Sequence, residues 1–161
     1  MKTLLIVWHS LTRGTQAMVS AAGAVVEPGV NIQSLRAKDA GAEDLLAADG
    51  YIFACPENLA SMAGVMKDFF DRSYYGALDQ IQGRPYASMI CAGSDGEGAA
   101  RQIARIAMGW RLRAVAEPLI VITHAQTADA IAAPKTISVT DQDRCRALGA
   151  TMAAGLGMGI F

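Results

Sequence analysis

The sequence predicts an α/β domain in which helices cover both faces of a five-stranded parallel β-sheet. Short apolar runs of strand length alternate with segments of helical periodicity along the chain, as in consecutive β-α units. The 161 residues suit a single domain over residues 1–161. A content of 52% hydrophobic against 18% charged residues excludes a disordered chain.

Charge and cysteine content narrow the class of protein further. The formal net charge of −1 offers no basic surplus for binding nucleic acid. No apolar run approaches the roughly 20 residues of a membrane span, and no secretory signal is recognisable. Cys55, Cys91 and Cys145 are too few and too widely spaced for a disulfide framework or a zinc site, so we expect no metal. These features favour a cytoplasmic protein.

The expected strands differ in how apolar they are. Residues 3–8 and 50–55 are almost continuously apolar, which is typical of strands covered on both faces. Residues 30–35 alternate apolar and polar side chains instead. Two further apolar runs, at residues 86–92 and 119–123, complete the predicted sheet.

Helical spacing predicts helices in the intervals between these strands. The first stops at Pro28-Gly29, and residues 42–48 form a short second helix. Apolar positions at helical spacing mark the first helix at Met18, Ala22 and Val25, and the third at Met62, Met66, Phe69, Phe70 and Ser73.

Two helix starts are predicted from pairs of capping residues. Ser94 and Glu97 form a capping box, in which each side chain satisfies a free amide of the first turn. After a loop of about 16 residues, Thr140 with Asp143 caps a last helix. The inner faces of these two helices are Ala99, Ile103, Ala107 and Trp110, and Cys145, Leu148 and Met152.

Topology alone indicates where a ligand would bind. In a doubly wound parallel sheet, ligands lie beyond the carboxyl ends of the strands, where the strand order reverses. The loops to search are therefore residues 9–15, 56–61 and 93–98.

The first of these loops is rich in groups that bind anions. Ser10, Thr12 and Thr15 supply hydroxyls, and Gly14 allows close approach of the backbone. The following helix start adds free amides and a partial positive charge. The loop therefore predicts a cradle for a terminal phosphate monoester, or else an ordinary capped helix start.

This loop resembles the phosphate-binding loop of the flavodoxin family, written Ser/Thr-x-Thr-Gly-x-Thr. Its three hydroxyl positions match, while Arg13 stands at the glycine position and the glycine follows one residue later. Three interpretations of Arg13 are open: its side chain pairs with the phosphate, it points outward, or it marks a loop that no longer binds the ligand. The resemblance implies that the phosphate of flavin mononucleotide (FMN) is bound by Ser10, Leu11, Thr12, Arg13, Gly14 and Thr15.

A second segment resembles flavodoxin-like quinone and flavin reductases. It runs from Ala48-Asp49 through a strand ending at Pro56 to Lys67, Phe69 and Asp71-Arg72. The resemblance implies that the flavin ring lies against two loops. The residues concerned are Pro56, Glu57, Asn58, Leu59 and Ala60, and Gly93, Ser94, Asp95 and Gly96.

Other residues near the predicted site carry two interpretations. Tyr74 and Tyr75 help to shape the pocket or are helix-end tyrosines. His9 and His124 donate to a ring oxygen or are structural. The charged side chains of the second segment are expected on a solvated helix face.

The resemblance covers roughly residues 3–122 and implies a flavodoxin-like three-layer α/β/α sandwich with strand order 2-1-3-4-5. It implies an oxidoreductase that passes electrons from NAD(P)H through FMN to a quinone or flavin, with no catalytic side chain. The implied partners are a small-molecule acceptor or a redox protein, and a homodimer or homotetramer. Two alternatives stay open: a one-electron carrier, and a relic of the fold that no longer binds FMN.

Overall fold

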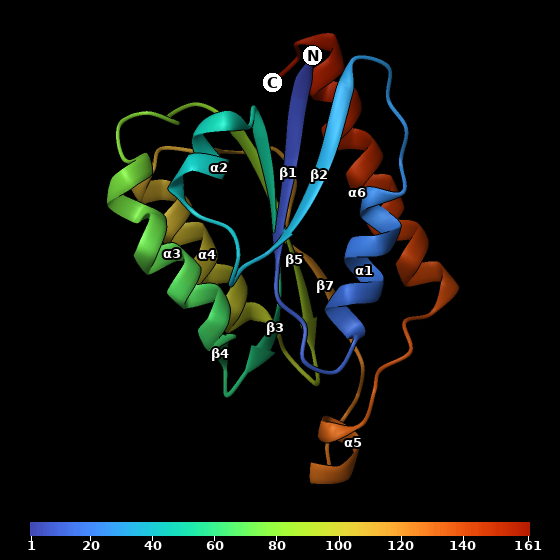
Figure 1. The fold of residues 1–161 in the computed structure, drawn as a ribbon. Coiled ribbons are helices and arrows are strands. Elements are labelled where there is room, and N and C mark those ends of the chain that lie inside the picture. The colour runs from blue at the N-terminus through green and yellow to red at the C-terminus, as the bar shows by residue number, and fades with distance from the viewer.

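The computed structural model describes residues 1–161 as three layers, with a sheet between two layers of helices (Figure 1). The strand order is β2-β1-β3-β5, with β6 and β7 both paired to β5, and these pairings are parallel. The predicted fold class and core strand order are therefore confirmed. The elements are β1 (Lys2–Trp8), α1 (Gly14–Gly23), β2 (Val30–Arg36), α2 (Ala42–Ala47), β3 (Gly50–Asn58), β4 (Ser61–Met62), α3 (Gly64–Ala77), β5 (Pro85–Ala92), α4 (Glu97–Gly109), β6 (Arg113–Ala114), β7 (Leu119–Ile122), α5 (Ala128–Ala132) and α6 (Val139–Met158).

The strand that borders β5 is interrupted. β7 pairs with the carboxyl half of β5, whereas the two-residue β6 pairs with Pro85 and Tyr86 at its start. Pro118, which directly precedes β7, has no amide hydrogen to donate to the ladder. The single predicted strand at residues 119–123 is therefore only the second piece of this edge.

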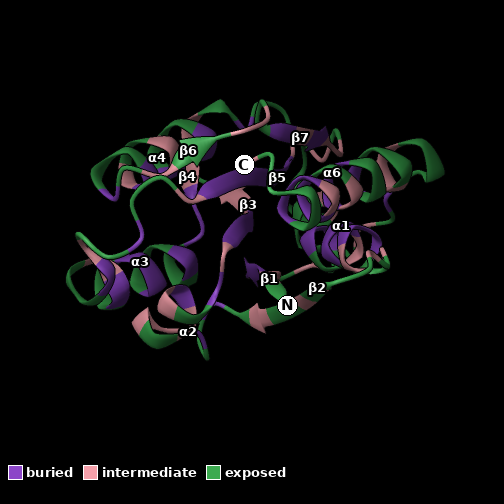
Figure 2. Cartoon of the chain, turned by 90° about the horizontal axis from the view of Figure 1, so that it is seen from above, coloured by how far each residue is buried: buried purple, intermediate pink, exposed green.

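Side chains alternate between the two faces of the sheet and build two separate cores. On β1, Leu5 and Val7 pack toward α3 and α4, while Leu4 and Ile6 pack toward α1 and α6. Burial is concentrated on the central strands, whereas the edge strand β2 is partly exposed (Figure 2). This explains why the central strands have apolar sequences and β2 alternates.

Aromatic side chains fill the core on the α3–α4 side. Phe53 of β3 lies within 5.2 Å of Phe70 and 6.4 Å of Trp110, measured between ring centroids. Tyr74 stacks on Trp110 at 5.5 Å with an interplanar angle of 16°. These contacts fix α3 and α4 against the sheet and so set the position of the loops at their ends.

Several predicted element boundaries are wrong. α1 ends at Gly23, so Val25 lies beyond it. α3 begins at Gly64, so Met62 lies in β4 instead. α6 begins at Val139 because the Oγ atom of Ser138, rather than Thr140, accepts a hydrogen bond from the amide of Asp141, at 3.1 Å. The short α5 interrupts the predicted long loop. None of the helices combines the length and the apolarity needed to cross a membrane.

Candidate functional site

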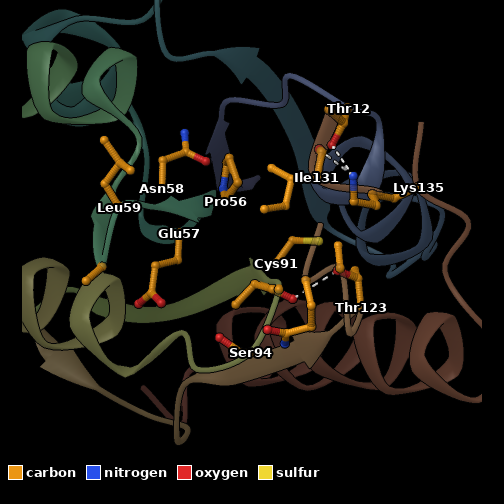
Figure 3. Close-up of a pocket in the computed structure, with 15 residues that line it drawn as sticks. Thr12, Pro56, Glu57, Asn58, Leu59, Cys91, Ser94, Thr123, Ile131 and Lys135 are labelled. Carbon is orange, nitrogen blue, oxygen red and sulfur yellow. Dashed lines mark hydrogen bonds between the residues drawn. The ribbon is translucent and has the colours of Figure 1, made fainter. Parts of the chain in front are cut away.

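The carboxyl ends of β1, β3, β5 and β7 surround a cavity of about 370 Å³ (Figure 3). All three predicted loops approach it, together with the segment between β7 and α6, residues 123–138, which we call the strap. The cavity is lined by Thr12, Pro56, Glu57, Asn58, Leu59, Ala60, Cys91, Ala92, Gly93, Ser94, Thr123, Ala125, Gln126, Ile131 and Lys135. Of the predicted site residues, Ser10, Leu11, Arg13, Gly14, Thr15, Asp95 and Gly96 lie outside this lining.

The first loop leaves two hydroxyl groups without hydrogen-bond partners. The Oγ atom of Ser10 and the Oγ1 atom of Thr15 are buried, and neither has a partner. Thr15 is 1% exposed. A buried hydroxyl without a partner is destabilising, by about 1–3 kcal/mol. Thr15 lies in the first turn of α1 and Ser10 in the loop before it, and the first amides of α1 also have no partner within the helix. The loop thus presents unsatisfied polar groups that fit a bound phosphate.

Arg13 adopts the backbone conformation that favours glycine. Its φ is 69° and its ψ is −6°, in the left-handed region, directly before the first residue of α1. The side chain is exposed and does not line the cavity. The loop therefore keeps the backbone shape that a glycine at this position would provide, while the arginine points outward.

Gly14 has a packing role. A Cβ atom at this position would lie 2.6 Å from the Sγ atom of Cys91 and 3.3 Å from the Cβ atom of Lys135. Gly93 similarly allows the carbonyl oxygen of Ala125 to lie close, since an added Cβ would be 2.8 Å from it. Gly14 thus lets the start of α1 lie close to β5 and the strap, and Gly93 lets the strap lie close to the end of β5. The sequence alone suggests only a phosphate-binding role for Gly14.

The second loop is a tight β-hairpin, because β3 continues past Pro56 to Asn58. Asn58 pairs with Ser61 of β4 in antiparallel fashion. The two residues of the turn, Leu59 and Ala60, have φ values of 53° and 62°, as in a type I′ turn, which favours Asn-Gly. The side chain of Leu59 is fully exposed beside the cavity.

Glu57 joins this hairpin to the start of α4. Its carboxylate accepts hydrogen bonds from the amides of Gly96, at 2.9 Å, and Ala99, at 3.1 Å. The predicted capping box of Ser94 with Glu97 is wrong, because Gly96 is the N-cap residue, with φ of 88° and no side-chain cap. A carboxylate 39 residues away satisfies the helix start instead.

Gln102 of α4 binds the second strand of the hairpin, β4. Its Oε1 atom accepts hydrogen bonds from the Oγ atom of Ser61, at 3.0 Å, and the amide of Met62, at 2.8 Å. With the two bonds to Glu57, these contacts hold the hairpin and α4 as one unit.

The strap brings a cation to the first loop that the sequence analysis missed. The amide of Lys135 donates to the carbonyl oxygen of Thr12, at 2.7 Å, and the Nζ atom lies 3.4 Å from the Oγ1 atom of Thr12 (Figure 3). Nζ also donates to the carbonyl oxygens of Ile131 and Ala133, at 2.8 and 2.6 Å. Glu57 and Lys135 are thus the two charged side chains among the lining residues.

Burial keeps nearby titratable groups neutral. Burial raises the pKa of the Cys91 thiol to about 11, although the cation of Lys135 opposes this shift. Burial and then the charge of Arg36 lower the pKa of His9 below 6.5, so its imidazole is neutral at pH 7. Neither His9 nor His124 lines the cavity.

Several candidate residues have structural surroundings instead. Tyr75 is exposed, and the cavity lining contains no aromatic residue. On α3, Lys67 pairs with Asp71, and Asp68 with Arg72, as expected of a solvated face. The guanidinium of Arg72 also donates to two carbonyl oxygens after β2, those of Ala37 and Ala40.

One known protein family matches most of this chain. A family model described as NADPH-dependent FMN reductase matches residues 13–127, from the first loop to the start of the strap. No match was found among curated proteins.

Solved structures share the fold at low sequence identity. A flavodoxin from the domain Archaea has a TM-score of 0.76 and 19% identity, covering 96% of this chain and 99% of that one. A WrbA-like protein from Agrobacterium tumefaciens has a TM-score of 0.68 and 20% identity, covering 98% and 99%. Rubredoxin oxygen:oxidoreductase from Desulfovibrio gigas has a TM-score of 0.78 and 13% identity, covering 99% of this chain but 37% of that protein. These likenesses establish the architecture of the chain.

Proposed function

We propose that this chain, which belongs to the NADPH-dependent FMN reductase family, holds the FMN phosphate in the loop of residues 9–15. The flavin ring then lies in the cavity. The observation that carries this proposal is the pair of buried hydroxyls, on Ser10 and Thr15, that have no partner within the protein. Buried polar groups are normally paired, so an external acceptor at this loop would satisfy both hydroxyls. The one other such hydroxyl, that of Ser73, lies in α3 and outside the cavity lining. A phosphate monoester supplies several acceptor oxygens and negative charge, both of which suit that position.

The residues around the cavity bind and orient, and none of them acts as a catalytic acid or base. Bound FMN supplies the redox chemistry, because its ring accepts and releases electrons. Glu57 is engaged with the start of α4, and the exposed Asn58 offers an amide at the rim. Leu59 and Ile131 add apolar surface from the hairpin and the strap.

We further propose that the electrons come from NAD(P)H and go to a quinone or a free flavin. The family match favours a reductase, and the net charge of −1 differs from the strongly acidic surface typical of carriers that dock on basic partners. The likeness to solved flavodoxins favours the alternative, an electron carrier. A homodimer or homotetramer stays a prediction.

Substitution of Thr15 tests the phosphate site. Thr15→Val removes the unpartnered hydroxyl while keeping its volume, so it should not destabilise the ligand-free protein. FMN affinity, measured by calorimetry, should fall about ten- to a hundredfold, as expected for one lost hydrogen bond to a charged group. Thr151→Val, on the exposed face of α6, is the matched control. Equal FMN affinity in the two variants would place the phosphate elsewhere.

A reduction experiment separates the candidate activities. The protein reconstituted with FMN is mixed without oxygen with NADPH or NADH, and the flavin absorption is followed. A reductase loses that absorption with the nicotinamide alone and regains it on addition of a quinone. A carrier is reduced only by a protein donor or by light. A relic binds no FMN at all.

A further inference from the structure

We propose that Lys135 of the strap binds the phosphate of the flavin nucleotide and makes the site selective for FMN over riboflavin. This inference rests on the proposed function, because it assigns a second source of binding to the same phosphate. Lys135 lies outside residues 13–127, the part of the chain that matches the family model.

Lys135 is held at the first loop by its backbone as well as by its side chain. Its amide bonds the carbonyl oxygen of Thr12, at 2.7 Å, which fixes the Cα position whatever the side chain does. Its Cβ atom lies where the absence of a side chain at Gly14 leaves room. The Nζ atom then reaches the Oγ1 atom of Thr12, at 3.4 Å. The ammonium group thus lies beside one of the three hydroxyls expected to surround the phosphate.

The partners of this ammonium group are neutral. Nζ donates to the carbonyl oxygens of Ile131 and Ala133 and to the hydroxyl of Thr12, so its three donors face no carboxylate. Glu57, the other charged residue of the lining, is engaged with the amides of α4. The cavity therefore contains a half-buried positive charge without a counter-ion, held by Thr12 at the same loop in which the hydroxyls of Ser10 and Thr15 have no partner.

A phosphate monoester completes this arrangement. It carries close to two negative charges near neutral pH and accepts hydrogen bonds on three oxygens. The ammonium group can exchange a carbonyl partner for a phosphate oxygen while the backbone bond to Thr12 keeps the strap in place. The carbonyl partners are neutral, whereas a phosphate oxygen carries negative charge, so the exchange adds a Coulombic attraction that favours a phosphorylated ligand. Arg13, which is exposed and outside the cavity lining, does not supply this charge.

The test compares two flavins on two lysine variants. Lys135→Gln removes the charge but keeps the backbone amide that bonds Thr12. Lys38→Gln makes the same change in net charge at an exposed residue near the carboxyl end of β2, outside the cavity lining. Affinities for FMN and for riboflavin are measured by quenching of flavin fluorescence at low and high salt. Lys135→Arg, which keeps the charge, completes the set.

We expect Lys135→Gln to weaken FMN binding about ten- to a hundredfold and to leave riboflavin binding unchanged. Its FMN affinity should also depend less on salt than that of the wild type. Lys135→Arg should keep most of the FMN preference, and Lys38→Gln all of it.

Two results would overturn the inference in different ways. If the wild type prefers FMN and Lys135→Gln keeps that preference, or loses affinity for both flavins equally, Lys135 does not bind the phosphate. If the wild type binds FMN and riboflavin equally well, the phosphate site itself is wrong, and the proposed function fails along with the role of Lys135. Urea unfolding of the ligand-free variants confirms that each one is folded.

Discussion

Replacing the Glu57 carboxylate tests whether a long-range cap holds α4 in place. In Glu57→Gln, one carboxylate oxygen becomes an amide nitrogen, which cannot accept the hydrogen bond from Gly96 or Ala99 that it faces. A hydrogen bond to a charged group contributes about 1.5–3 kcal/mol, so we expect the free energy of unfolding to fall by about 2 kcal/mol. In a domain of this size, that loss lowers Tm by about 4–8 °C.

The measurement is urea unfolding of the ligand-free protein, followed by circular dichroism. Glu97→Gln is the matched control, because Glu97 is exposed in the first turn of α4 and its side chain makes no hydrogen bond. This control loses only the interaction with the helix dipole, about 0.3–1 kcal/mol. If Glu57→Gln unfolds at the same urea concentration as Glu97→Gln, the two hydrogen bonds do not stabilise the start of α4.

Three further predictions concern the backbone and the pH dependence. Arg13→Gly should raise the free energy of unfolding by about 0.5–1 kcal/mol. This figure is the energy cost of the left-handed backbone at arginine, less the greater conformational entropy that glycine gives the unfolded chain. An unchanged urea midpoint would contradict this. Replacing Leu59-Ala60 by Asn-Gly should raise the free energy of unfolding by about 1 kcal/mol, and a lower urea midpoint would mean that the exposed leucine is needed for folding. Because the pKa of His9 is lowered, the folded state binds fewer protons, and the free energy of unfolding should fall as the pH drops below 6.5. His9→Gln should therefore lose less free energy of unfolding than the wild type between pH 7.5 and 5.5. The measurement is the free energy of unfolding of both proteins across this pH range.

The strands could be predicted because their environment is encoded locally. A central strand of a parallel sheet is covered on both faces, so residues 50–55 had to be apolar without alternation. The inward faces of α3 and α4 follow from helical spacing in the same way. Thr12 of the first loop, Pro56 to Ala60 of the second, and Gly93 and Ser94 of the third could be placed near one cavity because topology puts the carboxyl ends of the strands at one edge.

Helix starts and the cation of the site could not be predicted, because they depend on contacts between distant residues. Ser94 and Glu97 have the spacing of a capping box, but the helix starts after Gly96, and Glu57 accepts from the amides of Gly96 and Ala99 from the hairpin instead. The orientation of Arg13 is set by a left-handed backbone that local propensity disfavours for arginine. Nothing near Lys135 in the sequence indicates that it lies beside Thr12.

The contact between Thr12 and Lys135 spans 123 positions of the chain. At a synthesis rate of about 5–20 residues per second, Lys135 leaves the ribosome roughly 6–25 seconds after Thr12. β1, β2, β3 and β5 have all been synthesised by then, so the nascent sheet can assemble before the ammonium group is available. Binding of the proposed nucleotide would then be one of the last events in maturation. A chain stalled before the strap would have a nearly complete sheet but a low affinity for its ligand.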